Sequence, residues 1–127
     1  EGSLPRTLVV FYQDRQGKVP VLEWLDALPA KIQDKCVVKI ERLRELGHEL
    51  RRPEADSLRD GIYELRISRG GMNYRILYFF HGRVAAVLVH ALVKEREVPA
   101  SDIEKALERK RQFEHNPAAH TYREVIS

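Results

Sequence analysis

The stretch YELRISRGGMNYRILYFF, residues 63–80, constrains the fold of this chain more than any other. Two runs in which apolar and polar side chains alternate flank Gly70 and Gly71. Alternation with a period of two is typical of β-strands, and two glycines between such runs indicate a tight turn. The sequence therefore predicts a β-hairpin with strands over 62–68 and 72–80.

Each strand of this predicted hairpin carries an arginine between large apolar side chains. By alternation, Arg66 lies on the face opposite Leu65 and Ile67, and Arg75 lies on the face opposite Ile76. An antiparallel pair brings both guanidinium groups to one surface, where they repel each other unless an anion lies between them. Carboxylates and phosphates are the anions that guanidinium groups bind best.

The residues before the hairpin predict one strand and two helices. A β-branched and aromatic run over 6–14 predicts the strand, and Pro20 lies where a helix can begin. Pro29 ends this short helix and begins a second one, which Gly47 ends. The two helices form an α-hairpin whose apolar side carries Val21, Leu25, Leu28, Ile32, Cys36, Ile40 and Leu43.

The residues after the hairpin predict a third meander strand and a final helix. The run VAAVLVHALV within 83–93 has no polar face, which is typical of a strand buried on both sides. The pattern Ser-Asp-Ile-Glu at 101–104 predicts a capping box for a helix that Pro117 ends. Residues 50–60 show no periodic pattern, so we expect them to be irregular.

This order of elements predicts an α+β domain: N-terminal strand, α-hairpin, antiparallel three-strand meander and C-terminal helix. With 127 residues the chain is long enough for one core. We expect a single domain over 4–116 and a tail of uncertain order over 117–127. Residues 1–3, Glu-Gly-Ser, are interpreted as a cloning remnant.

Positive charge is concentrated in the middle of the chain. The formal net charge is only +3, but residues 50–96 contain nine basic and five acidic side chains. Such an excess indicates either a polyanion such as nucleic acid or an acidic partner, or else a solvated charged face. Lys94 and Arg96, at the end of the third meander strand, can join the hairpin arginines.

The sequence allows two predictions for the hairpin arginines: either they form ion pairs within the protein, or their guanidinium groups are open to a ligand. Glu64 and Glu95 most simply pair with Arg66 and Arg96. Five acids are nevertheless too few to neutralise nine cations, so we expect open guanidinium groups along a groove. On this interpretation, replacing Arg75 costs little stability.

Several other classes of function lack their sequence signals. The five histidines and the single Cys36 form no zinc spacing, and there is no glycine-rich phosphate loop. No apolar run approaches the length of about 20 residues that spans a membrane, and no signal-peptide pattern begins the chain. One cysteine allows no internal disulfide, which fits a reducing cytoplasm.

The segment LRDGIYELRISRGGMNYRILYFFHGRVAAVLVHALVKEREVPASDIEKALER resembles the RelE/ParE toxin superfamily. It is most similar to the phage-derived, HigB-like branch of bacterial type II toxin-antitoxin toxins. That branch shows a Gly-aliphatic-Tyr-Glu-Leu-Arg strand, a Tyr-Arg-aliphatic-Leu-Tyr-Phe strand, and a long apolar strand ending in lysine. A proline and a terminal helix follow. Residues 57–110 carry the similarity.

The resemblance implies a RelE-like fold and a cytoplasmic mRNA interferase, an endoribonuclease that cuts mRNA on the translating ribosome. The implied chemistry is attack of a ribose 2′-hydroxyl on the adjacent phosphate, without metal or cofactor. The implied partners are ribosome, mRNA and a cognate antitoxin, usually a helix-turn-helix protein, and no membrane. The implied catalytic residues are Arg66, Arg75 and Lys94, and the implied RNA-binding residues are Arg69, Tyr74 and Arg96.

The chain departs from the pattern of its relatives at two places. Glu64 stands where some relatives have lysine, and Asp102 and Ile103 stand where relatives use a tyrosine. The proton-transfer group therefore stays open among His81, His90, Tyr74, Tyr78, Glu64 and Glu95. Two other functions stay open as well: a ParE-like gyrase inhibitor, and an inactive module that binds RNA or antitoxin.

Overall fold

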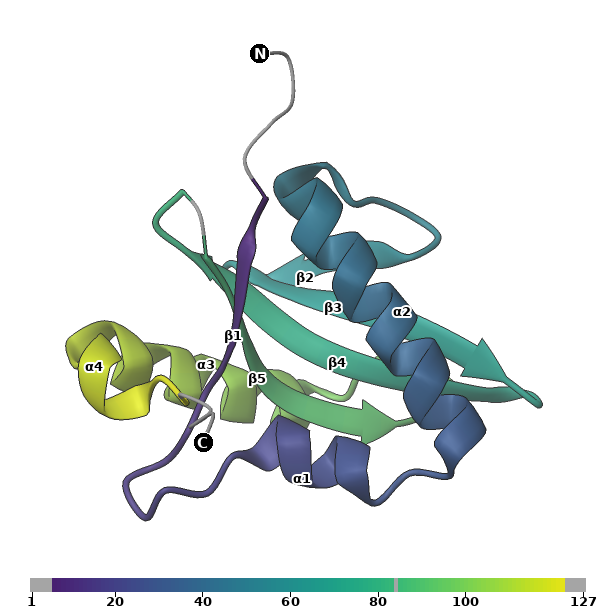
Figure 1. Ribbon diagram of the computed structural model, residues 1–127, viewed down its shortest axis with the longest axis horizontal. Helices are drawn as coiled ribbons and strands as arrows, with labels where there is room; N and C mark the ends of the chain where they lie inside the picture. The colour runs from purple at the N-terminus through teal and green to yellow at the C-terminus, as the bar shows by residue number, and fades with distance from the viewer. Residues whose placement is uncertain (1–5, 84, 123–127) are drawn as a thin grey trace, which may run out of the picture.

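A five-stranded β-sheet forms the middle layer of the protein (Figure 1). The computed structural model describes residues 6–83 and 85–122, so the interpretation of residues 1–3 lies outside the described residues. The strands lie in the order β1-β5-β4-β3-β2. Their bounds are Leu8–Phe11 (β1), Ala55–Arg59 (β2), Ile62–Arg69 (β3), Met72–His81 (β4) and Ala85–Val93 (β5).

The α+β class and the antiparallel meander β3-β4-β5 are confirmed, and β1 adds a parallel strand beside β5. The expectation of irregular structure throughout 50–60 is wrong. Residues 55–59 form β2, which pairs antiparallel with β3. Only Ala55 of this strand is buried. β2 lies at the edge of the sheet and is mostly polar. Its sequence therefore lacks the apolar run by which a strand is usually predicted.

The turn between β3 and β4 fixes which residues lie opposite each other. Gly70 and Gly71 both have positive φ angles, +59° and +81°, which is the conformation that a two-residue hairpin turn requires and that glycine adopts without strain. The pairing that follows sets Arg66 directly opposite Arg75. The two arginines therefore meet on one face of the sheet, as the alternation predicts.

Two helical layers cover the two faces of the sheet (Figure 1). Helix α1 (Pro20–Asp26) and helix α2 (Ala30–Leu46) lie on one face. Helix α3 (Ala100–His115) lies on the other. Each layer has its own apolar core. The α1–α2 side includes Leu25, Cys36, Ile40, Leu65 and Ile76, and the α3 side includes Leu77, Phe79, Val89, Leu107 and Phe113.

The predicted capping box does not form. Helix α3 begins at Ala100 directly after Pro99, and no side chain caps it. Asp102 bonds to His90 instead, and Glu104 pairs with Arg59. Of the two side chains on which the capping box depends, Ser101 and Glu104, the second therefore has a tertiary partner instead.

The beginning of the predicted tail packs against the domain. Pro117–His120 form the short helix α4, and the buried His120 ring stacks on Tyr12 at a centroid distance of 5.3 Å. Thr121 forms an antiparallel bridge with Tyr12. The sequence did not predict this contact between the two ends of the described chain.

Candidate functional site

The hairpin arginines lie at a cavity beside helix α3. The cavity has a volume of about 460 Å³. Its lining residues are Asp56, Leu58, Arg59, Glu64, Arg66, Arg75, Arg96, Glu97, Val98 and Ile103. A larger cavity of about 850 Å³, bordered by α2, also touches Arg66 and Arg75. The two arginines therefore stand at the junction of two hollows in the surface.

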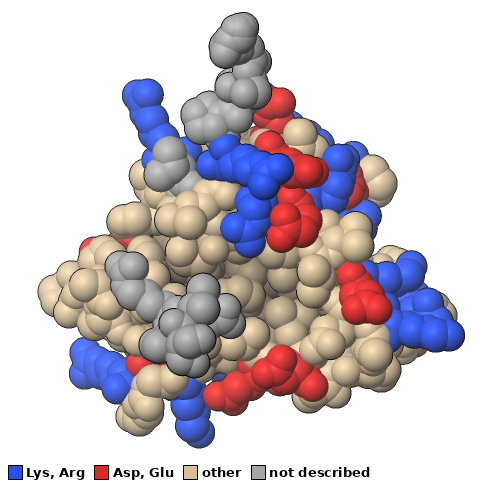
Figure 2. Space-filling model, in the orientation of Figure 1, with Lys and Arg blue, Asp and Glu red and all other residues tan. Residues whose placement is uncertain are grey.

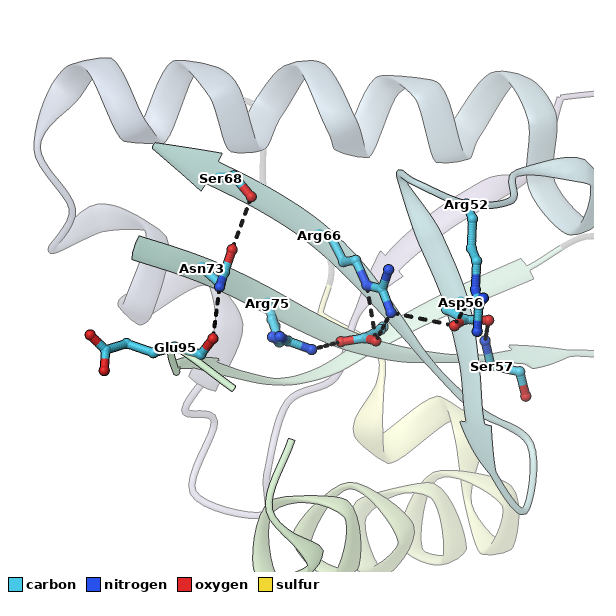
Figure 3. A network of polar contacts seen from close by, with 9 residues as sticks. Arg52, Asp56, Ser57, Arg66, Ser68, Asn73, Arg75 and Glu95 are labelled. Carbon is cyan, nitrogen blue, oxygen red and sulfur yellow. Dashed lines mark hydrogen bonds and ion pairs between the residues drawn. The ribbon is translucent and has the colours of Figure 1, made fainter. Parts of the chain in front are cut away.

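Glu64 bridges the two arginines. Figure 3 labels Arg66, Arg75 and Asp56 within this network of polar contacts. Its Oε1 accepts a hydrogen bond from Nη1 of Arg75. Its Oε2 accepts from Nη2 of Arg66 at 2.8 Å and from Nε of Arg66 at 3.1 Å. Asp56 also contacts Nη2 of Arg66 at 3.3 Å and is itself held by Arg52. One buried carboxylate thus bonds to two guanidinium groups.

The expectation of open guanidinium groups is wrong for Arg66 and Arg75. The simpler alternative, an ion pair between Glu64 and Arg66, is confirmed and extends to Arg75. Arg75 is nearly buried and Glu64 is only 2% exposed, so the expectation that replacing Arg75 costs little stability does not fit this burial. A count of acids does not predict this arrangement, because one carboxylate has two oxygens and can bond to two cations.

The other predicted site residues do not all lie at this cavity. Arg96 lines it together with the hairpin arginines. Lys94 and Arg69 are exposed and do not line it. Tyr74 belongs to the core on the α1–α2 side, where its ring lies 6.3 Å from that of Trp24. The structure therefore brings three of the six predicted residues together.

Charge on the visible face does not form one basic patch. Figure 2 shows blue Lys and Arg groups beside red Asp and Glu groups, with a broad uncharged area between them. Along α2, for example, Lys39 and Arg42 both bond to Glu54, and the hydrogen bond from Arg42 lowers the pKa of that carboxyl to about 2. The excess counted in the sequence is thus partly neutralised by local pairs.

His90 is held on both ring nitrogens. Its Nε2 lies 2.7 Å from Asp102 Oδ1 on α3, and its Nδ1 lies 3.3 Å from Nη1 of Arg109. Burial lowers the pKa of His90, and the hydrogen bond to Asp102 opposes this effect. With Asp102 accepting and Arg109 donating, the ring is neutral. These contacts join α3 to β5 and leave neither nitrogen free to take a proton from a substrate.

Three further charged residues line the cavity and were not predicted from the sequence: Asp56, Arg59 and Glu97. Asp56 and Arg59 lie on β2, a strand that no sequence pattern indicates. Glu97 follows the end of β5, next to Arg96 in the chain. The sequence indicates a role for Asp56 and Arg59 only weakly, because their position at the cavity depends on the pairing of β2 with β3.

In residues 6–83 and 85–122, no group of three or more His, Cys, Asp or Glu side chains is arranged to hold a metal ion. Within the same residues, no helix is both long and apolar enough to cross a membrane. The side chains that line the cavity include cations and carboxylates. Such a set binds an anion and shields negative charge.

Comparison with known families gives one match. The family model described as phage-derived protein Gp49-like (DUF891) matches residues 23–111, more than half of the chain. The match includes α2, the complete meander and the cavity arginines. No curated protein matches the chain. The chain therefore belongs to the Gp49-like family of phage-derived proteins, which is part of the RelE/HigB-like group of toxins.

Proposed function

We propose that this protein is the toxin of a bacterial type II toxin-antitoxin system and that it cleaves mRNA on the ribosome. One observation carries the proposal: Arg66 and Arg75 lie opposite each other on neighbouring strands and line one cavity together with Arg96. Two adjacent guanidinium groups fit the oxygens of one phosphate. Membership of a toxin family supports the same function.

The proposed reaction needs no metal. The 2′-oxygen of a ribose attacks the adjacent phosphorus and loses its proton. The bond from phosphorus to the 5′-oxygen breaks, and that oxygen gains a proton. The products are a 2′,3′-cyclic phosphate and a free 5′-hydroxyl. Negative charge grows on the phosphoryl oxygens in the transition state, and fixed cations at these oxygens lower the barrier.

Each cation has a distinct place in this proposal. Arg66 and Arg75 contact the scissile phosphate, and Arg96 contacts the RNA backbone beside it. Arg69, the last residue of β3, and Lys94, which directly follows β5, are both exposed. In this proposal they contact RNA or the ribosome further from the scissile phosphate. Because both nitrogens of His90 are engaged, His90 is not the proton-transfer group.

The proposal includes the fold and the partners. We propose that the arrangement of β1, the α-hairpin and the meander is RelE-like, and that the protein acts in the bacterial cytoplasm. We further propose that an antitoxin, a helix-turn-helix protein, binds it and blocks cleavage. Pull-down from the native host tests this: the proposal expects a small DNA-binding protein, and recovery of gyrase subunits alone would contradict it.

Translation of a defined mRNA in a purified system tests the activity. The expected result is a set of new mRNA 5′ ends that require both ribosomes and the protein. These ends should accept phosphate from polynucleotide kinase without prior phosphatase treatment, because they carry a 5′-hydroxyl. An intact mRNA together with blocked DNA supercoiling favours a gyrase inhibitor. An intact mRNA without any effect on supercoiling favours a binding module.

A further inference from the structure

The arrangement of Arg66 and Arg75 requires a specific support. The two residues are directly opposite each other on β3 and β4, and like charges at such positions destabilise a sheet. Both guanidinium groups nevertheless lie at one cavity. Something must hold them there before any substrate arrives.

Glu64 supplies this support with both of its oxygens. Oε1 bonds to Arg75 and Oε2 bonds to Arg66, so each oxygen serves one guanidinium. Among residues 6–83 and 85–122, no acceptor bonds to Nη1 of Arg66 or Nη2 of Arg75. The carboxylate thus fixes one side of each guanidinium, and Nη1 of Arg66 and Nη2 of Arg75 are the nitrogens that keep hydrogen-bonding capacity for a phosphate.

Glu64 is too deeply buried to act as the proton acceptor of the proposed reaction. The residue is 2% exposed and both of its oxygens are engaged, so a ribose 2′-hydroxyl does not reach it in this arrangement. Its charge nevertheless lies next to the phosphate site. A buried carboxylate there opposes RNA binding, because it repels the phosphate.

We propose that Glu64 is a positioning residue that aligns Arg66 and Arg75 on the scissile phosphate. The proposal rests on the proposed function. Glu64 increases the rate of cleavage by fixing the geometry of the two cations, and it decreases RNA affinity through its charge. The two effects have opposite signs, which gives the proposal a signature that a purely structural residue does not have.

The variant Glu64→Gln separates these effects. The amide oxygen accepts a hydrogen bond from one arginine, while the amide nitrogen turns toward the other and releases it. Affinity is measured on ribosomes that carry mRNA with a 2′-deoxyribose at the mapped cleavage position, and the rate is measured in single turnover. We expect tighter binding with a salt slope steeper by about 0.7. We also expect cleavage to slow about 10²-fold, because the cations are misplaced.

Glu97→Gln is the matched control. Glu97 lines the same cavity, so the variant removes the same charge, but the residue makes no ion pair with Arg66 or Arg75. We expect tighter binding and an unchanged cleavage rate. Both variants are compared with wild type at a temperature where circular dichroism shows all three to be folded.

Other outcomes overturn the proposal. If Glu64→Gln lowers affinity and rate together, the residue has only a structural role, and if it speeds cleavage, the residue is an inhibitory latch. If Glu64→Gln does not fold, Glu64→Asp replaces it: the charge is kept, so an unchanged affinity with slower cleavage is expected, and an unchanged rate contradicts the proposal. If wild type leaves mRNA intact, the proposed function fails first, which is a different result.

Discussion

Replacing Arg75 with methionine tests whether the buried ion pair with Glu64 carries stability. Methionine keeps most of the aliphatic length but leaves the Glu64 carboxylate with Arg66 alone. The Arg75 side chain is 11% exposed and Glu64 is 2% exposed, so water does not replace the lost contact. At an effective dielectric constant of about 20, two charges 4 Å apart attract by about 4 kcal/mol. We therefore expect Arg75→Met to destabilise the fold by about 3–5 kcal/mol.

The double variant Glu64→Met with Arg75→Met provides the internal comparison. It removes the buried carboxylate as well, and Arg66, whose side chain is 36% exposed and which also contacts Asp56, can turn toward water. A buried ion pair replaced by apolar side chains of similar volume is often nearly neutral in stability. We expect the double variant to be more stable than Arg75→Met by at least about 2 kcal/mol, which is a coupling between contacting residues.

Urea denaturation followed by circular dichroism measures these free energies of unfolding. Urea is preferred to guanidinium chloride because it adds no screening ions. The reasoning is refuted if Arg75→Met lies within about 1 kcal/mol of wild type, or if the effects of the two substitutions simply add. The result also bears on toxicity assays, because a loss of growth inhibition by an Arg75 variant indicates a lost catalytic cation only when the variant is folded.

Two further predictions concern buried groups. Burial lowers the pKa of His90; Asp102 raises this pKa, and Arg109 and Lys105 lower it further. Below pH 6.5, the ordinary pKa of histidine, the unfolded chain therefore takes up a proton on His90 that the folded chain does not. The free energy of unfolding should thus fall from pH 7.5 to 5.5, and this fall should be smaller in His90→Gln; equal urea midpoints at both pH values in wild type contradict this. Burial raises the pKa of the fully buried Cys36 thiol to about 11, so it should not react with iodoacetamide at pH 8 until urea unfolds the chain, and rapid labelling of the native protein contradicts this.

The sequence predicted most of the elements because their signals are local. Proline and glycine mark both ends of α2, and the apolar stripe of Cys36, Ile40 and Leu43 is buried as expected. Strand β2 was missed because its register depends on β3 rather than on its own residues. The capping box of α3 failed for a related reason: Glu104 pairs with Arg59 on β2, a contact that no local pattern contains.

The contacts of Arg66 and Arg75 follow from the pairing of the strands and not from the number of charged residues in the segment. The Gly-Gly turn pairs Arg69 with Met72, and counting back along both strands sets Arg66 opposite Arg75. Alternation then places Glu64 on the same face, two residues from Arg66. These two steps together indicate one carboxylate beside two guanidinium groups. The total of acids and bases in the segment does not contain this information, because neutralisation depends on which oxygens each cation can reach. A carboxylate at this position therefore bonds to both cations, a contact that the pairing of the strands indicates and the count of charges does not.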